Sequence, residues 1–194
     1  MNKNDIRGIT VFLVVVVLLL AGYFYPRRPN NQKFDIPAEQ PNIPVEQYPQ
    51  YKVVPGSVYD GDTIRVVPMN VNGFPKDQQL RIRFACIDAP ERKQPGGIEA
   101  RDELKRILEM DGNRVKLNII TTDRYGRSVA EVWNGYGLIQ SALAGSGAVY
   151  PYEQYKSDCP SWDAVQRSGQ FAVKNKLGVW GNPSAVKPWD YRKK

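Results

Sequence analysis

The chain has 194 residues, of which 42% are hydrophobic, and it contains no histidine. This length and hydrophobic fraction suffice for one folded domain with accessory segments. The absence of imidazole excludes histidine-ligated zinc sites, Ser-His-Asp triads and nucleases whose general base is a histidine. The net charge of +7 is consistent with a polyanionic partner and equally with a generic basic surface.

An uncharged apolar run at residues 9–25 follows a tail of residues 1–8. The run reaches the lower limit of about 17 residues for a membrane-spanning helix. It ends in the aromatic residues Tyr23, Phe24 and Tyr25, which are typical of a bilayer interface. We therefore expect an uncleaved membrane anchor; a cleaved secretory signal peptide is the alternative, although no small-x-small cleavage site follows the run. Basic residues flank both ends, so the sequence leaves the orientation open.

Residues 26–50 contain six prolines among polar residues, and this composition predicts a Pro-rich linker. From residue 51 the sequence consists of short strand-like runs separated by turn residues. A folded domain is therefore expected to begin there and to extend to residue 182. The tail of residues 183–194 has a pattern that favours no particular structure.

Short runs rich in β-branched and aromatic residues predict five strands in the domain. They cover Val53–Tyr59, Thr63–Pro68, Leu80–Cys86, Arg114–Ile120 and Ser128–Trp133. Apolar residues at helical spacing predict three helices. These cover Gly97–Met110, Leu138–Ala144 and a stretch from Trp162 to a stop at Gly178, with Ser161 as the N-cap. The order predicts an α+β fold, mainly β, around a small five-stranded barrel.

The two cysteines allow two interpretations. Cys86 lies in a strand-like run and Cys159 in a loop-like stretch, so both are candidates for reduced thiols. A single disulfide between them is the alternative, and it would require an oxidising compartment outside the cytoplasm.

Acidic and basic residues recur in three short motifs within the predicted barrel. They are Asp60-Gly61-Asp62-Thr63, Arg83-x-x-x-x-Asp88-Ala89-Pro90-Glu91 and Asp123-Arg124-Tyr125-Gly126-Arg127. Each is weak alone, but the three in this order resemble the staphylococcal nuclease (thermonuclease) family over residues 52–182. The chain is similar to a membrane-anchored bacterial member. The resemblance implies an OB-fold barrel of five strands with three helices and Ca²⁺-dependent hydrolysis of DNA and RNA with little sequence specificity.

Matched by position, Asp62 and Asp88 resemble the carboxylates that ligate one Ca²⁺ ion, and the backbone carbonyl of Ala89 resembles a third ligand. Carboxylate oxygens suit hard divalent cations, and two cysteines without histidine are too few for a structural zinc site. Glu91 matches the group that orients or deprotonates the attacking water.

Arg83 and Arg127 match the guanidiniums that grip the phosphate and stabilise charge in the transition state. The expected substrate contacts are Arg124, Tyr125, Tyr150 and Tyr152. Arg83 and Asp88 are five residues apart and would face opposite sides of a regular strand. The site therefore requires the chain to bend before Asp88, as Pro90 indicates.

The predicted function is that of a monomeric, membrane-anchored nuclease outside the cytoplasm, acting on single- or double-stranded DNA and RNA with no protein partner implied. Secretion after cleavage is the alternative location. Two other functions remain open: a catalytically inactive OB-fold module that binds nucleic acid or protein, and a structural subunit of a membrane assembly.

Overall fold

The computed structural model describes residues 44–193. The predicted membrane-spanning run at 9–25, the tail before it and the linker to residue 43 lie outside the described residues. Within residues 44–193, no helix is long and apolar enough to cross a bilayer. The last residues assigned to the linker belong to the fold, because Val45–Gln47 form a short 3-10 helix and Tyr48 is buried in the core.

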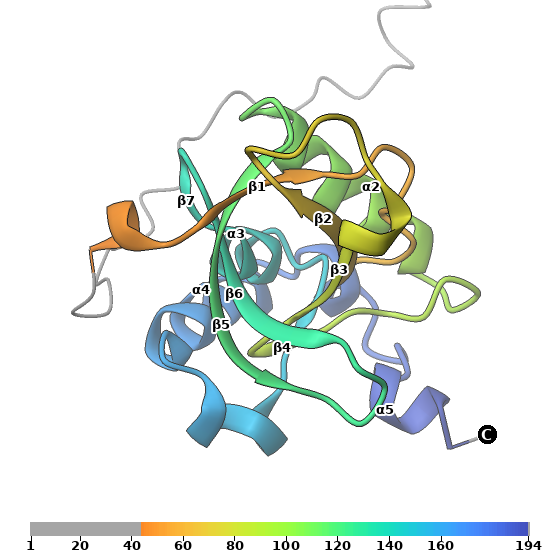
Figure 1. The fold of residues 1–194 in the computed structure, drawn as a ribbon. Helices are drawn as coiled ribbons and strands as arrows, with labels where there is room; N and C mark the ends of the chain where they lie inside the picture. The colour runs from red at the N-terminus through yellow and green to blue at the C-terminus, as the bar shows by residue number, and fades with distance from the viewer. Residues whose placement is uncertain (1–43, 194) are drawn as a thin grey trace, which may run out of the picture. The chain divides into compact units, whose positions relative to one another are not determined.

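Five strands close into a barrel (Figure 1). They are β1 (Gln50–Val53), β2 (Thr63–Pro68), β3 (Leu80–Phe84), β5 (Arg114–Thr122) and β6 (Ser128–Asn134). Antiparallel pairing links them in the order β3-β2-β1-β5-β6, and a parallel pairing of β3 with β6 completes the circle. The predicted mainly β architecture is therefore confirmed.

Side-chain alternation in β2 and β3 gives each strand a buried and an exposed face. Ile64, Val66 and Ile82 are fully buried, whereas the intervening Arg65 and Arg81 are exposed. Successive strand residues point to opposite faces, so the apolar set fills the barrel and the arginines line its outer surface.

Two predicted strand boundaries are wrong. The first strand was expected at Val53–Tyr59, but β1 ends at Val53 and a turn follows, in which the Ser57 amide donates to the Val54 carbonyl and Gly56 has a φ of +71°. The Pro55-Gly56 dipeptide explains this turn. The third strand was expected to reach Cys86 but ends at Phe84, because Cys86 adopts a φ of +70°.

Three helices pack against the barrel, as predicted: α2 (Gly97–Glu109), α3 (Ile139–Gly145) and α4 (Trp162–Lys174). The predicted cap of α4 differs, because the Ser161 hydroxyl caps nothing and its amide instead donates to Oε1 of buried Glu131 at 2.7 Å. This helix also ends at Lys174, before the expected stop at Gly178.

Three very short strands and a short helix complete the fold. They are β4 (Ile87–Asp88), β7 (Gly137–Leu138), β8 (Tyr150–Pro151) and α5 (Pro188–Tyr191). Strand β7 pairs antiparallel with the end of β6, and β4 pairs with β8 in a separate antiparallel ribbon. Helix α5 lies in the tail for which the sequence favoured no structure.

Of the two cysteine interpretations, the structure has the disulfide. It joins Cys86 to Cys159 across 73 residues, and both residues are buried. The bridge ties the bend after β3 to the loop that precedes α4.

Asp123 organises the turn between β5 and β6. Its Oδ1 accepts the amides of Tyr125 and Arg127, each at 2.9 Å, and its Oδ2 accepts Nε of Arg127 at 2.7 Å. Burial alone would raise the pKa of Asp123, but the hydrogen bonds from Arg127 and Tyr125 outweigh it and hold this pKa below its usual range. The carboxylate therefore fixes both the turn and the direction of the Arg127 side chain.

We expect Asp123→Asn to lower the free energy of unfolding at pH 7 by about 1–2 kcal/mol, because the charge-assisted hydrogen bonds are weakened. A depressed folded pKa gives stability that is present above the unfolded pKa of 3.8 and is lost as the pH falls through the folded pKa. The deficit of the variant should therefore shrink as the pH drops below 3.8. Urea denaturation across this range measures it, and an unchanged deficit in acid would contradict the assignment.

Candidate active site

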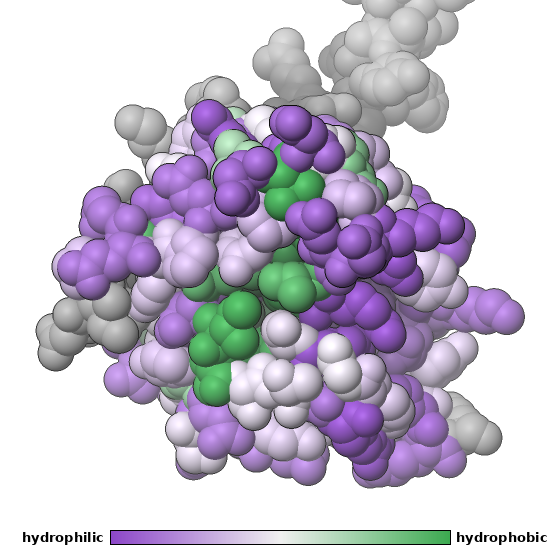
Figure 2. Space-filling view, in the orientation of Figure 1, coloured by the Kyte–Doolittle hydropathy of each residue, from purple (hydrophilic) through white to green (hydrophobic). Residues whose placement is uncertain are grey.

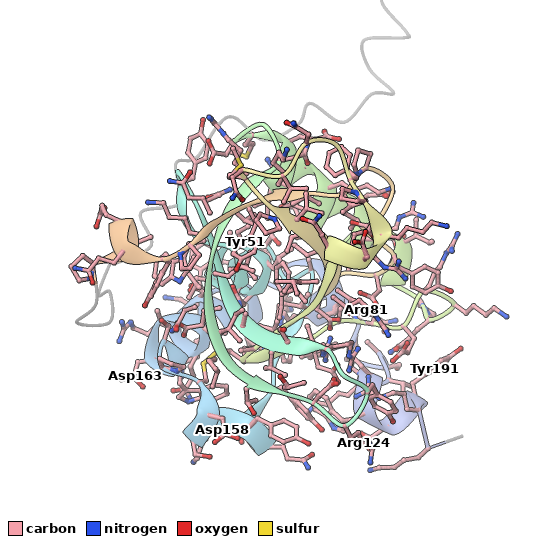
Figure 3. The ribbon with its side chains drawn as sticks, viewed as in Figure 1. Tyr51, Arg81, Arg124, Asp158, Asp163 and Tyr191 are labelled. Carbon is pink, nitrogen blue, oxygen red and sulfur yellow. A yellow bond between two sulfur atoms is a disulfide. The ribbon has the colours of Figure 1, made fainter. Side chains whose placement is uncertain are left out.

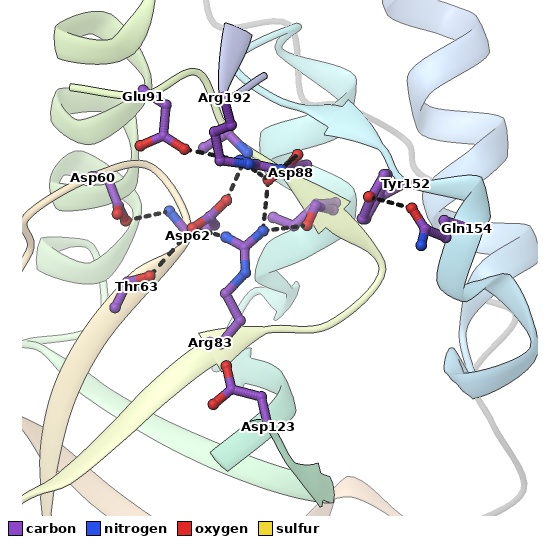
Figure 4. Close-up of polar contacts among 12 residues, drawn as sticks. Asp60, Asp62, Thr63, Arg83, Asp88, Glu91, Asp123, Tyr152, Gln154 and Arg192 are labelled. Carbon is purple, nitrogen blue, oxygen red and sulfur yellow. Dashed lines mark hydrogen bonds and ion pairs between the residues drawn. The ribbon is translucent and has the colours of Figure 1, made fainter. Parts of the chain in front are cut away.

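A guanidinium bridges two buried aspartates at one end of the barrel (Figure 4). Arg83 on β3 forms an ion pair with Asp62, which directly precedes β2, and its Nη2 lies 2.6 Å from Oδ1 of Asp88 on β4. Asp62 is 3% exposed and Asp88 is fully buried. Buried carboxylates need a cationic partner, so this bridge is a condition for their burial.

The predicted bend that turns Asp88 toward Arg83 is present, but Cys86 makes it rather than Pro90. The left-handed conformation of Cys86 redirects the chain between β3 and β4. The Cys86 carbonyl accepts the Tyr152 amide at 2.8 Å, and Asp88 then pairs with Tyr150 in the β4–β8 ribbon. The disulfide and this ribbon together hold the bend.

Close packing sets the position of Asp62. A Cβ atom on Gly61 would lie 2.7 Å from Cβ of Ala100 on α2 and 2.9 Å from Cβ of Ala89, so only glycine fits between the loop and the helix. The Ala89 amide donates to Oδ2 of Asp62 at 2.6 Å. The sequence assigned a role to the Ala89 carbonyl, and the contact that the structure shows at this residue is made by its N–H.

Asp60 is part of the site, although the sequence indicated only a turn. Its Oδ1 accepts the Asp62 amide at 3.2 Å. Burial raises the pKa of Asp60, and the positive charges of Arg83 and Arg127 oppose that rise. The repeated acidic residue in Asp60-Gly61-Asp62 was the available signal.

A second guanidinium reaches the carboxylates from the C-terminal tail. Arg192 donates through Nη2 to Oδ2 of Asp88 at 2.6 Å, and through Nη1 to Oδ1 of Asp88 at 3.2 Å and to Oε1 of Glu91 at 2.8 Å. Its hydrogen bonds to Asp88, and then to Glu91, raise the pKa of Arg192, although partial burial opposes this. Sequence reasoning missed Arg192, because no pattern in the tail connects it with residues about a hundred positions earlier.

The expected substrate tyrosines lie beside this cluster under two tryptophans. Tyr150 is 2% exposed, with the rings of Trp180 and Trp189 at 4.9 and 5.8 Å. Tyr152 stacks on Trp189 at 5.0 Å and donates its hydroxyl to Oε1 of Gln154 at 2.6 Å. Burial and the negative charge of Asp88 raise the pKa of Tyr152. Both tyrosines therefore border the aspartates, but the aromatic surface of Tyr150 is covered.

The remaining predicted residues lie on the β5–β6 turn. Tyr125 is 62% exposed, and the guanidiniums of Arg124 and Arg127 lie 4.9 and 5.6 Å from its ring centre. Arg127 forms its ion pair with Asp123 rather than with the aspartates that Arg83 bridges. The structure thus brings Asp62, Arg83, Asp88 and Glu91 into one bonded network and places Arg127 at its border.

The donor set fits a hard divalent cation. The buried carboxylates of Asp62 and Asp88, with Glu91 alongside, offer oxygen ligands, and two guanidiniums already supply positive charge at this position. In residues 44–193, one group of three potential ligands has its atoms within 4.8 Å of one another, and it consists of Cys86, Glu131 and Cys159. Both of those sulfurs are bonded to each other in the disulfide, so Asp62 and Asp88 are the better candidate for a cation site.

Comparison with known proteins identifies the same family that the three charged motifs resemble. The family model described as "Staphylococcal nuclease homologue" matches residues 81–182. An uncharacterized endonuclease of Escherichia coli O157:H7 is 34% identical over 136 residues, which are 70% of this chain and 80% of that protein. Protein ParB of Escherichia coli is 30% identical over 146 residues, or 70% of this chain and 76% of that protein.

The staphylococcal-like nuclease CAN1 of Arabidopsis thaliana is 32% identical over 118 residues, or 60% of this chain. The matched region spans 34% of the plant protein, about a third of its length. The family match covers more than half of the present chain and includes Arg83, Asp88, Glu91 and Arg127. The chain therefore belongs to the staphylococcal nuclease family of phosphodiester hydrolases.

Proposed function

We propose that the protein is a Ca²⁺-dependent nuclease that cleaves DNA and RNA with little sequence specificity, on a barrel of the OB type. The observation that carries this proposal is the buried pair Asp62 and Asp88, joined by Arg83 and bordered by Glu91. Burying two carboxylates costs free energy that the fold has to offset, and active sites are where charged groups are concentrated in this way.

Asp62 and Asp88 would hold one Ca²⁺ ion with the carbonyl of Ala89. When bound, the ion would neutralise phosphate charge and make a ligated water more acidic. Glu91 is half-buried at the edge of the network, where its carboxylate can accept a proton from the attacking water. Arg83 and Arg127 would donate to phosphate oxygens, since a planar guanidinium matches two of them at once.

We expect Glu91→Gln in the full-length protein to lower the cleavage rate of single-stranded DNA and RNA by about 10²–10⁴-fold, because the general base is removed. Binding of the same oligonucleotide should change little, since the substitution removes no phosphate contact. Cleavage is measured with Ca²⁺ and with chelator, and binding by fluorescence anisotropy.

Glu99→Gln is the matched control, because Glu99 is exposed on the first turn of α2. It should retain wild-type cleavage. Undiminished activity of Glu91→Gln would show that Glu91 is not the general base. Undiminished wild-type activity in chelator would show that cleavage does not require Ca²⁺. Binding without cleavage in any divalent cation would favour the inactive binding module.

The proposed setting is a membrane surface outside the cytoplasm, with residues 9–25 as the anchor and the domain acting as a monomer. Two observations support it: the apolar run at 9–25, and the Cys86–Cys159 disulfide, a bond that persists in oxidising compartments.

We expect the full-length chain to sediment with membranes and to resist alkaline extraction, because a spanning helix is held by its apolar surface. When intact cells are quenched in acid and the denatured chain is then alkylated, Cys86 and Cys159 should stay unmodified; denaturation is needed because both residues are buried. A soluble chain with both thiols alkylated would overturn the proposed location.

A further inference from the structure

A groove of about 420 Å³ begins beside the candidate active site on the outer face of the barrel. Its lining includes Arg65, Arg81 and Arg127, together with Asp60 and Tyr59. Asp60 and Arg127 also border the aspartate pair, so the groove continues from the position where a phosphodiester would be cleaved. Figure 3 labels Arg81 on a side of the molecule that is largely hydrophilic in Figure 2.

The strand register sets two of these arginines against each other. Arg65 on β2 is the direct cross-strand partner of Arg81 on β3, and the next pair on the same face is Thr63 with Arg83. Directly opposed side chains in an antiparallel pair lie close together, and like charges in such a pair are destabilising. Three guanidiniums therefore follow one another along this face, from the bridge at Arg83 outward.

Within residues 44–193, neither Arg65 nor Arg81 forms an ion pair. Arg65 has a long contact of 3.5 Å from Nη1 to Oε1 of Gln79. This contrasts with Arg83 and Arg127, which are paired with aspartates. An opposed pair of uncompensated arginines is a site to which an anion would bring a net electrostatic gain.

We propose that this groove binds the sugar–phosphate backbone of a nucleic-acid strand beyond the cleaved bond, with Arg65 and Arg81 each contacting a phosphate. Guanidiniums bind phosphate oxygens through two donors at once, and the groove is continuous with the catalytic cluster. Tyr59 is 60% exposed at the groove, with the Arg92 guanidinium 5.0 Å from its ring centre, and offers a stacking surface to an unpaired base. The inference rests on the proposed nuclease function and extends it to a preference for long strands.

The test compares single-stranded DNA of about 20 nucleotides, long enough to fill such a groove, with a dinucleotide that reaches only the catalytic cluster. In Arg65→Ala/Arg81→Ala, the ratio of kcat/KM for the long strand to that for the dinucleotide should fall at least about tenfold. The slope of log(kcat/KM) against log[salt] on the long strand should become less negative by about 1.4, since each lost phosphate contact on a single strand removes about 0.7.

The matched control is Lys105→Ala/Arg114→Ala, which removes the same charge at a partly exposed and an exposed position, neither of which lines the groove. It should leave both the ratio and the salt slope near their wild-type values. Equal salt slopes for the two double variants would overturn the proposal that the groove binds the nucleic-acid backbone. Cleavage of neither substrate by the wild-type protein would instead overturn the nuclease function, and the anisotropy of the long strand would still decide whether the groove binds it.

A separate observation concerns the C-terminal segment, residues 186–193. Its backbone is tied to the domain at Val186, whose carbonyl accepts Nε2 of buried Gln94 at 2.5 Å, and Pro188 is buried. From there Trp189 covers Tyr150 and Tyr152, and Arg192 enters the carboxylate cluster.

We infer that the C-terminal segment competes with ligands for the active site: Arg192 takes the oxygens of Asp88 and Glu91 that a divalent cation needs, and Trp189 covers the tyrosines that a nucleotide needs. Both oxygens of Asp88 accept from Arg192, so a cation gains them only when the guanidinium leaves. The apparent affinity for the cation is then lowered by the fraction of molecules in which the segment is bound. This competition rests on the proposed cation site.

Calorimetric titration of the full-length protein with Ca²⁺, without nucleic acid, tests the competition. Arg192→Ala should lower the apparent Kd at least about threefold. Lys193→Ala, which breaks only an ion pair with Asp190 within the segment, should leave it unchanged. An unchanged or higher Kd in Arg192→Ala would overturn the competition, and absence of Ca²⁺ binding in every variant would overturn the cation site together with it.

Discussion

The burial of two carboxylates is the constraint on which the rest of the site depends. Asp62 and Asp88 are almost inaccessible to solvent, and removing an unpaired carboxylate from water costs several kcal/mol. Positive charge must therefore enter the same small space, and Arg83 supplies it to both aspartates. Arg192 adds a second guanidinium at Asp88. The site is built to hold cationic charge, whether a side chain or an ion provides it.

The backbone around Asp88 is fixed by contacts from distant parts of the chain. A residue other than glycine in the left-handed region costs about 1–3 kcal/mol and persists only where its surroundings impose it. At Cys86 the surroundings are the disulfide to the loop before α4 and the hydrogen bond from the amide of Tyr152, which follows β8. The same residues that terminate β3 thus direct Asp88 toward Arg83, so the barrel, the ribbon and the disulfide together support the geometry of the candidate site.

The arginines of the barrel differ in whether a carboxylate neutralises them, and this difference matches the two roles proposed for them. Arg83 is held by ion pairs with two aspartates, which suits the role proposed for it in stabilising the transition state. Arg127 is held by Asp123 at the border of the cluster. Arg65 and Arg81, farther out on the same strands, are solvated and unpaired in the described part of the chain, which suits a role in attracting a flexible polyanion.

The sequence determined the local pattern and the identity of the family. Alternation in β2 and β3, helical spacing in α2 and the three charged motifs depend on neighbouring residues, so they are readable along the chain. Only the tertiary structure decided how distant residues meet. It paired Cys86 with Cys159, placed the bend at Cys86, buried Tyr150 under tryptophans and brought Arg192 to Asp88. These four features depend on contacts between segments far apart in the chain. Such contacts stabilise the protein only when the barrel and its helices have packed together and excluded water.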